Sequence, residues 1–357
     1  MPNERADVAH VLDDPPPLHR KLLDYGERPY WSADGTRIAF IETNYGDVCE
    51  LDVDSGQVRN LTKGLGEHHA FLRVLILSNG DYLLIGPRQF TDRDTSRHVE
   101  SELWVLDKNA SRPPKPLGRR IFEGCGVSTN SPLITYAVTG RNDPGLGDPD
   151  VSECHVTEIA YGDDGPELGE DRVFYRTRRG LRPEPQDFRH DDTEVVFAEY
   201  VRVAGDVRPR CVVKGCRLDT GEFTTYIDEP MVHNECEGIF PDHEYICLES
   251  SCDTDWPMFP PRDLWKLKLD GSQQRVRMTS MPGDHTWKAT NSNVSPDGRW
   301  LAFMVGLRAD EAGFGRGLGL LDLDAWERTP DAERWETPAD RARENAAKLL
   351  NSTSGKP

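Results

Sequence analysis

One short pattern recurs six times along the chain, at intervals of about 45 to 61 residues, and it constrains the fold more than any other feature. Its clearest copies are residues 31–40 (WSADGTRIAF) and 294–303 (VSPDGRWLAF), and weaker copies occupy residues 76–84, 127–136, 188–197 and 239–248. In each copy a polar turn that tolerates positive φ separates two runs of alternating apolar residues, which is typical of an antiparallel hairpin. Repeats of this length, built from short strands, predict propeller blades.

A third strand is expected after the hairpin, and a fourth strand after that. Third strands are expected at 48–53, 103–106, 211–218 and 264–269, and fourth strands at 58–62 and 275–279. The last repeat has a third strand at 317–323 but no fourth, and residues 20–24, which resemble 59–63, supply it. We therefore predict an all-β, six-bladed β-propeller closed by an N-terminal strand, while the weakly patterned stretch 140–185 leaves room for seven blades.

The ends of the chain differ from the repeats. We expect an N-terminal extension at residues 1–19, the propeller at 20–327, a short C-terminal helix within 328–350 and a disordered tail at 351–357. The helix is expected because residues 331–350 are rich in Ala, Glu and Arg and contain no Gly.

Charge and composition exclude some classes of partner. The net charge is −19, from 43 basic and 62 acidic residues, and the basic residues form no stripe, so neither nucleic acid nor an anionic membrane is an expected partner. The N-terminus has no apolar segment of signal-peptide length, which predicts a cytoplasmic protein. The eight cysteines lack paired C-x-x-C spacing and are expected to be reduced and buried.

The W-S-x-D-G-x-x-I-A-F frame resembles the repeat of TolB-like, WD-repeat-like β-propellers over residues 20–327. Relatives of this type include the TolB protein, peptidase-associated propellers and oligogalacturonate lyases, so the resemblance implies a fold and leaves the function open. In the oligogalacturonate lyases a divalent metal is held by histidines and a glutamine in the axial pocket. Their His-x-His before the last turn is replaced here by Asn291-Ser-Asn293.

One face of the predicted disc should carry the function. The loops between second and third strands are long, whereas the hairpin turns on the opposite face are short, and long loops on a rigid scaffold commonly bind ligands. The polar segments that precede the inner strands lie on the same face, nearest the axis. We therefore expect these segments to converge on one central pocket.

Two hypotheses for the chemistry of this pocket follow. His69 (or His68), Gln186, His233 and His285 would bind a divalent ion such as Mn²⁺, Fe²⁺ or Zn²⁺, with one side chain from each of four blades. Alternatively, Glu235 and Glu237 lie two residues apart on an extended segment and would serve as a catalytic acid and base.

The remaining polar and aromatic candidates are expected to contact the ligand; they are Arg28, Arg88, Gln186, Trp256, Asn291 and Asn293. We predict that the propeller binds a small polar ligand, a sugar or oligosaccharide derivative, in the axial pocket, and acts on it as a lyase or hydrolase. The competing prediction is a non-catalytic scaffold whose disc holds a protein partner.

Overall fold

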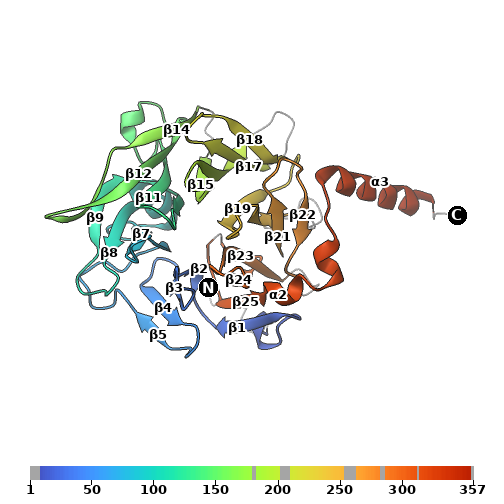
Figure 1. The fold of residues 1–357 in the computed structure, drawn as a ribbon, viewed down its shortest axis with the longest axis horizontal. Coiled ribbons are helices and arrows are strands. Elements are labelled where there is room, and N and C mark those ends of the chain that lie inside the picture. Colours follow the sequence, from blue (N-terminus) through green and yellow to red (C-terminus); the bar gives the residue numbers. More distant parts are fainter. Residues whose placement is uncertain are drawn as a thin grey trace.

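The computed structural model describes residues 9–178, 182–201, 210–252, 263–281, 286–311 and 313–354. Six antiparallel sheets surround a common axis as the blades of a disc, and the chain passes through them in order (Figure 1). The predicted six-bladed β-propeller is therefore confirmed. Most described residues outside the strands form turns and loops, and the few helical turns lie in loops or near the ends of the chain.

Each blade begins with its innermost strand. Blade 1 consists of β2 (Glu27–Trp31), β3 (Arg37–Ile41), β4 (Val48–Asp52) and β5 (Val58–Asn60). Blade 2 consists of β6 (Arg73–Ile76), β7 (Tyr82–Gly86), β8 (Glu102–Leu106) and β9 (Lys115–Arg120). Blade 3 consists of β10 (Phe122–Val127), β11 (Leu133–Thr139), β12 (Ser152–Gly162), β13 (Gly165–Leu168) and β14 (Arg172–Thr177).

The other three blades follow the same plan. Blade 4 consists of β15 (Arg182–Arg189), β16 (Glu194–Val201), β17 (Arg210–Arg217) and β18 (Phe223–Ile227). Blade 5 consists of β19 (Asn234–Ile239), β20 (Tyr245–Ser250), β21 (Asp263–Lys268) and β22 (Arg275–Arg277). Blade 6 consists of β23 (Trp287–Val294), β24 (Trp300–Leu307), β25 (Gly317–Asp322) and β1 (His19–Leu23).

The six sequence repeats coincide with the six inner hairpins, and the turn chemistry explains why. Asp34 accepts hydrogen bonds from the Ser32 hydroxyl (2.6 Å) and the Thr36 amide (3.0 Å), and Gly35 has a φ of 69°. Asp297 accepts equivalent bonds from Ser295 and Arg299 in blade 6. The aspartates of these two repeats thus hold the turns, and the glycine supplies the left-handed conformation that the turn requires.

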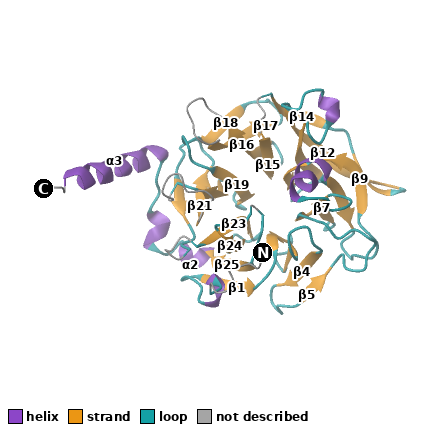
Figure 2. Ribbon diagram, turned by 180° about the vertical axis from the view of Figure 1, so that it is seen from behind, coloured by secondary structure: helices purple, strands orange, loops and turns teal. Residues whose placement is uncertain are grey.

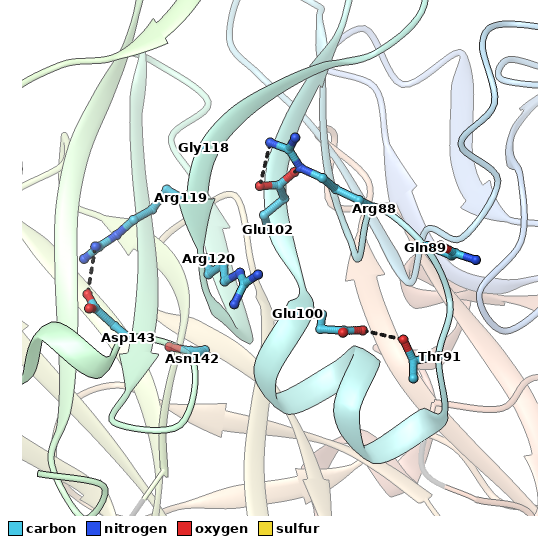
Figure 3. A pocket seen from close by; sticks show the side chains of 10 residues that line it. All are labelled: Arg88, Gln89, Thr91, Glu100, Glu102, Gly118, Arg119, Arg120, Asn142 and Asp143. Carbon is cyan, nitrogen blue, oxygen red and sulfur yellow. Dashed lines mark hydrogen bonds and ion pairs between the residues drawn. The ribbon is translucent and has the colours of Figure 1, made fainter.

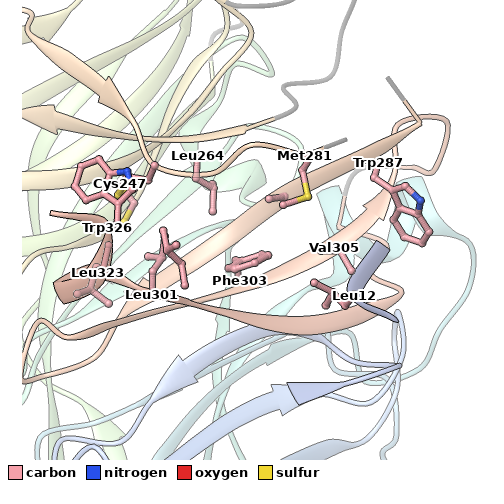
Figure 4. Close-up of a cluster of buried hydrophobic side chains, with 14 of the residues drawn as sticks. Leu12, Cys247, Leu264, Met281, Trp287, Leu301, Phe303, Val305, Leu323 and Trp326 are labelled. Carbon is pink, nitrogen blue, oxygen red and sulfur yellow. The ribbon is translucent and has the colours of Figure 1, made fainter. Parts of the chain in front are cut away.

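The ring is closed by its N-terminal strand. β1 pairs antiparallel with β25, from His19 opposite Leu321 to Leu23 opposite Leu318. Just before β1, the 3-10 turn η1 (Val11–Asp13) places Leu12 in the largest apolar cluster, between blades 5 and 6. Figure 4 shows Leu12 beside Val305 and Phe303 of β24 in this cluster. Both ends of the propeller are therefore tied into blade 6, as predicted.

The stretch 140–185 does not form a seventh blade, so that alternative was wrong. β12 is an 11-residue strand, and its first part pairs with both β11 and β14. Its far end, Ile159 to Gly162, continues beyond the blade and pairs with β13. The weak pattern arises because few residues of this hairpin are buried: Ile159 packs into a core cluster, whereas Tyr161 and Glu167 are exposed, so no regular alternation is required.

The chain after the ring crosses back to blade 5. Helix α2 (Leu323–Trp326) and the 3-10 turn η4 (Pro330–Glu333) lead to Glu336, which exchanges two 2.9 Å backbone hydrogen bonds with Arg275 of β22. The fully buried Arg275 guanidinium also donates to Glu229 (2.6 Å). The residues that lead to Glu336, called here the strap, thus cover the outer edge of blade 5. Without them, the edge strand β22 would be exposed and could pair with another chain.

Helix α3 (Pro338–Ser354) follows the strap and projects away from the disc (Figures 1 and 2). The predicted domain boundaries at residues 19, 327 and 350 stay a prediction. Among the described residues, no helix combines the length and the apolar character needed to span a membrane.

We predict that deleting residues 1–24, which removes β1, abolishes cooperative unfolding of the whole ring. The deletion exposes the hydrogen-bonding edge of β25 and opens the apolar cluster around Leu12. Thermal unfolding followed by circular dichroism measures the effect. Deletion of residues 338–357, which removes only the projecting helix, is the control and should leave one sharp transition. A sharp transition in both variants would contradict closure by β1.

Candidate functional site

The inner strands carry an irregularity at the same place in five of the six described blades. The pairing register shifts between the first and second strands, as at a β-bulge, next to Arg28, Glu123, Gln186, Glu237 and Asn291. Arg28 and Asn291 adopt positive φ values of 52° and 46° there. Bulges of this kind turn a side chain out of the regular alternation and are frequent next to functional sites.

These five residues, together with Arg73 at the start of β6, form what we call the axial ring, with one residue from each blade. Arg28 is paired with Glu123 across the axis. Arg73 donates to Gln186 (3.1 Å) and to Glu237 (3.5 Å), and the Asn291 amide donates to Glu237 (3.1 Å). The passage along the axis narrows here to about 20 Å³. The axial ring therefore divides the axis into two cavities.

The larger of the two, called here the central cavity, has a volume of about 300 Å³ and lies where the inner strands begin. Loop residues reach it from the side: Arg97 from the π-helical turn η2 (Ser96–Glu100), and Arg308, Asp310 and Gly313 from the loop after β24. The cavity thus lies on the face of the long second-to-third loops, as the sequence predicts. The second cavity, on the side of the hairpin turns, is called here the turn-side cavity.

The carboxyl groups of the central cavity fall into two classes. Burial raises the pKa of Glu237 to about 7, although Arg73 opposes the shift. Burial and the neighbouring Glu237 raise the pKa of Glu249 well above its ordinary value. Burial also opposes ionisation of Glu235, but the hydrogen bond (3.0 Å) and the charge of His233, together with hydrogen bonds from Glu184 and Tyr200, outweigh burial and lower the pKa of Glu235. Neighbouring carboxyls with pKa values displaced in opposite directions can divide into acid and base.

Asn291 holds two of these carboxyl groups in place. Its backbone amide donates to Glu249 (2.6 Å), and its side-chain amide donates to Glu237 (3.1 Å). Because the residue is in the left-handed region, both of its donors can face the same cavity. The bulge of β23 therefore fixes the relative positions of Glu237 and Glu249.

Basic groups balance the carboxyls. Burial opposes ionisation of Glu123, but the guanidinium groups of Arg28 and Arg97 outweigh it and hold the pKa of Glu123 well below its ordinary value. Burial lowers the pKa of Lys288, which lines the cavity beside Glu249. Among the described residues, the basic side chains that line the central cavity are Arg28, Arg73, Arg97, Lys288 and Arg308.

Some buried donor atoms of the described residues have no hydrogen-bond partner. Nη1 of Arg28 and Oγ1 of Thr290 are such atoms on side chains that line the central cavity, and Nε2 of Gln186 is one in the axial ring beside it. Each residue is at most 7% exposed, and each atom can donate a hydrogen bond. Buried donors are almost always paired, so their common position indicates a site for acceptor groups of a ligand.

The structure brings together most, but not all, of the residues that the sequence predicts. Arg28, His233, Glu235, Glu237 and Asn291 line the central cavity, whereas Gln186 lines the constriction at the axial ring. Asn293 lies beyond the ring, where its side-chain oxygen accepts from the Trp31 amide (2.8 Å). Trp256 and His285 lie outside the described residues.

Arg88 lies in a separate cleft between blades 2 and 3 (Figure 3). The cleft has a volume of about 630 Å³, and Arg119, Arg120 and Asn142 line its other side. Arg88 Nε donates to Glu102 (2.6 Å) on the blade 2 side of this cleft. Arg88 does not line the central cavity, because the segment after β7 directs it toward its own blade.

The predicted metal ligands do not meet. His69 is 40% exposed and is bound to Asp47 (2.6 Å), away from the axis. His233 is bound to Glu235, and the Gln186 oxygen accepts from Arg73. No cluster of three or more His, Cys, Asp or Glu side chains within the described residues could hold a metal ion. Among the described members of the predicted set, His69, Gln186 and His233 therefore do not share one metal site.

The sequence interpretation missed Arg73, Glu123, Arg97, Glu249 and Lys288. Two of these had a signal in the sequence. Each member of the axial ring stands six residues before a turn residue, as Arg28 does before Asp34, Arg73 before Asn79 and Asn291 before Asp297. Glu123 likewise stands six residues before the turn residue Thr129. Arg97, Glu249 and Lys288 lie at positions that this spacing does not mark.

Comparison with known proteins supports the fold. No family model and no curated protein matches the chain. An oligogalacturonate lyase from Vibrio parahaemolyticus is 10% identical with a TM-score of 0.50, covering 83% of this chain and 78% of that chain. An oligogalacturonate lyase in complex with manganese is 11% identical with a TM-score of 0.51, covering 83% and 77%. A gluconolactonase from Xanthomonas campestris is 13% identical with a TM-score of 0.50, covering 85% and 89%.

At these identities the likeness shows the β-propeller fold alone. The narrower resemblance to TolB-like propellers stays a prediction, because no family model supports it. The sugar chemistry and the manganese that these names mention are properties of those proteins.

We predict that Glu27→Gln stabilises the protein at pH 8 by about 1–3 kcal/mol and has little effect near pH 4. Glu27 is 1% exposed, and burial raises its pKa to about 7 from an ordinary value of 4.5. The folded form therefore binds the proton more tightly, and its stability is lost as pH rises from the ordinary pKa through the folded one. Chemical denaturation at several pH values measures this. Glu42→Gln, at an exposed position of the same blade, is the control. An equal gain from both variants would contradict the assignment.

Proposed function

We propose that the protein binds a small, anionic, hydroxylated molecule of the sugar-acid class in the central cavity and acts on it as a lyase or hydrolase. The observation that carries the proposal is the group of three buried donors without partners, on Arg28, Gln186 and Thr290. A carboxylate and its neighbouring hydroxyl groups supply the acceptors that these donors lack. The volume of about 300 Å³ is at the lower end of the range for small-molecule sites.

The charges of the cavity favour an anion. Its basic side chains face several carboxyls, but the pKa values of Glu184, Glu237 and Glu249 are all raised. Near neutral pH Glu237 is therefore only partly ionised, while the arginines stay protonated. A bound carboxylate would pair with these arginines.

A sugar derivative is the ligand class that agrees best with the rest of the site. Carboxyl groups and an amide facing one cavity can bind several hydroxyl groups at once. Oligogalacturonate lyase and gluconolactonase, whose structures resemble this fold, have names that point to sugar chemistry. This likeness adds support for the class of ligand but does not select a member of it.

Glu237 is the proposed acid and base. With a pKa of about 7 it exists in both protonation states at neutral pH, which is the condition for efficient proton transfer. As a lyase, Glu237 would take the proton from the carbon beside the carboxylate, and Glu249 would protonate the leaving oxygen. As a hydrolase, Glu237 would protonate the leaving oxygen, and the ionised Glu235 would take a proton from the attacking water.

We predict that D-galacturonate binds and that Thr290→Val weakens this binding about three- to tenfold, because one unpartnered donor is removed without a change of shape. Isothermal titration calorimetry measures the affinity, and D-galactose, which lacks the carboxylate, should bind more weakly. Thr135→Val is the matched control, since that buried hydroxyl already donates to His155 in blade 3. The proposal fails if neither sugar binds, or if both variants weaken binding equally.

Turnover is tested with oligouronides and neutral glycosides. We expect Glu237→Gln to lower kcat by a factor of about 100 or more while binding is retained, because the proton-transfer group is lost. Unsaturated products that absorb in the ultraviolet would identify a lyase, and reducing ends without unsaturation would identify a hydrolase. Absence of turnover with every substrate would reduce the proposal to ligand binding.

The divalent metal suggested by the histidines is tested separately. Because the predicted ligands are apart in the described structure, we expect EDTA to leave sugar binding unchanged. Elemental analysis of the purified protein should give metal well below one ion per chain. Stoichiometric metal that is lost in a His233→Ala variant would restore the metal hypothesis.

A second candidate function is a protein-binding scaffold. Helix α3 favours it, because its residues 339, 340 and 342–347 are exposed and an isolated helix gains little stability without packing. Where the protein partner is a second copy of this chain, light scattering after gel filtration measures the association as a mass above that of one chain. A mass above one chain that disappears when residues 338–357 are deleted would support the scaffold.

A further inference from the structure

The turn-side cavity is a second hollow on the propeller axis, opposite the central cavity. It has a volume of about 280 Å³, and residues from all six blades line it. The hairpin turns form its rim, including Ala33 in blade 1 and Pro296 in blade 6. Its size and axial position make it a cavity for a small molecule rather than a groove for an extended chain.

The walls of the turn-side cavity combine apolar and aromatic side chains with polar ones, which include Ser78, Thr129, Asn130 and Asn293. Tyr30, Trp31 and Phe188 contribute rings, and Ile76, Ile239 and Val294 contribute aliphatic side chains. Apolar surface facing a water-filled hollow is unfavourable, and a ligand that covers it with carbon would be stabilised. The ligand should therefore contain an apolar ring or a group of similar size.

The ionisable side chains that line the turn-side cavity are two carboxyl groups and one histidine. Asp187 and Asp192 line it together with His243, and no Lys or Arg of the described chain does so. Asp187 accepts from the amides of Phe188 (2.9 Å) and Ile239 (3.0 Å), and Asp192 accepts from two serine hydroxyls. These bonds hold both carboxyl groups in place. Burial raises the pKa of Asp187 to about 7, so Asp187 is only partly ionised at neutral pH, and the attraction for a cation rests mainly on Asp192. A cation is the complementary ligand charge.

The axial ring separates this cavity from the central one. At about 20 Å³, the space between them has room for little more than one water molecule. The hydrogen bonds from Arg73 to Gln186 and Glu237 close the passage. A ligand of the turn-side cavity is therefore distinct from the sugar-acid ligand of the central cavity, and the two can be tested independently.

We propose that the turn-side cavity is a second binding site, which takes a small organic cation that carries an aromatic or other apolar ring. The ring would cover the aliphatic walls, and the cationic group would lie among the aromatic side chains and the carboxyl groups of Asp187 and Asp192. Aromatic side chains attract ammonium groups through the negative face of the ring, and a carboxylate adds direct attraction.

The experiment compares three probes by calorimetry on the full chain at neutral pH. Benzyltrimethylammonium combines a ring with a fixed positive charge, tetramethylammonium has the charge alone, and benzyl alcohol has the ring alone. We expect the first probe to bind at least about fivefold more tightly than either of the others, because it satisfies both features of the site. Equal affinities for the three probes, or no binding at concentrations up to about 10 mM, would overturn the proposal.

Variants locate the binding. Ala33→Trp, at an exposed turn position on the rim, should block the cavity and abolish binding of benzyltrimethylammonium. Asp192→Asn should weaken it about three- to tenfold, and Asp242→Asn, in the turn of blade 5 outside the lining, is the matched control and should change it less than about twofold. Binding that survives in Ala33→Trp, or that responds equally to the two Asp→Asn variants, would overturn the assignment.

D-galacturonate provides the check of independence. Its affinity should be unchanged in Ala33→Trp, since the axial ring lies between the two cavities. If D-galacturonate fails to bind while benzyltrimethylammonium binds, the proposed function is lost and the second site stands. If the reverse holds, the second site is lost. Loss of both ligands in Ala33→Trp would place them in one cavity and overturn the second site.

Discussion

The antiparallel pairing of β1 with β25 is the constraint on which the rest of the structure depends. It turns a row of six similar sheets into a ring, and only a ring brings the first strand of every blade to one axis. Residues as far apart in the sequence as Arg28 and Asn291 then line the same cavity. The strap that returns from blade 6 to Arg275 adds a further tie, between blades 6 and 5.

Convergence has an energetic cost, because it buries charged groups. The propeller offsets that cost by pairing charges across the axis, as between Arg28 and Glu123, and by leaving some carboxyls protonated near neutral pH. The pairing is incomplete at Arg28, Gln186 and Thr290, where donors remain without partners. A ring optimised for stability alone would not retain these groups, and their presence is the physical basis for assigning a ligand to the central cavity.

The sequence was sufficient for the blades, since Asp-Gly turns and alternating strands are local features. It also identified the closing strand and the face of the central cavity. The overhanging hairpin of β12 and β13 has no regular sequence pattern because only a few of its residues are buried, and Arg97 reaches the cavity from a loop whose path no local pattern fixes. His69 was placed at the axis by its proximity to an inner strand, but its bond to Asp47 holds it outside. Whether the protein is cytoplasmic stays a prediction.

The bulge that recurs in the inner strands has a consequence for how such a protein can change. Because five of the six blades present one side chain from such an irregularity, that side chain can be exchanged while the scaffold is kept. These positions surround a shared opening, and new combinations of acids, bases and amides could appear there by single replacements. Diversification of chemistry is thereby uncoupled from the evolution of the framework.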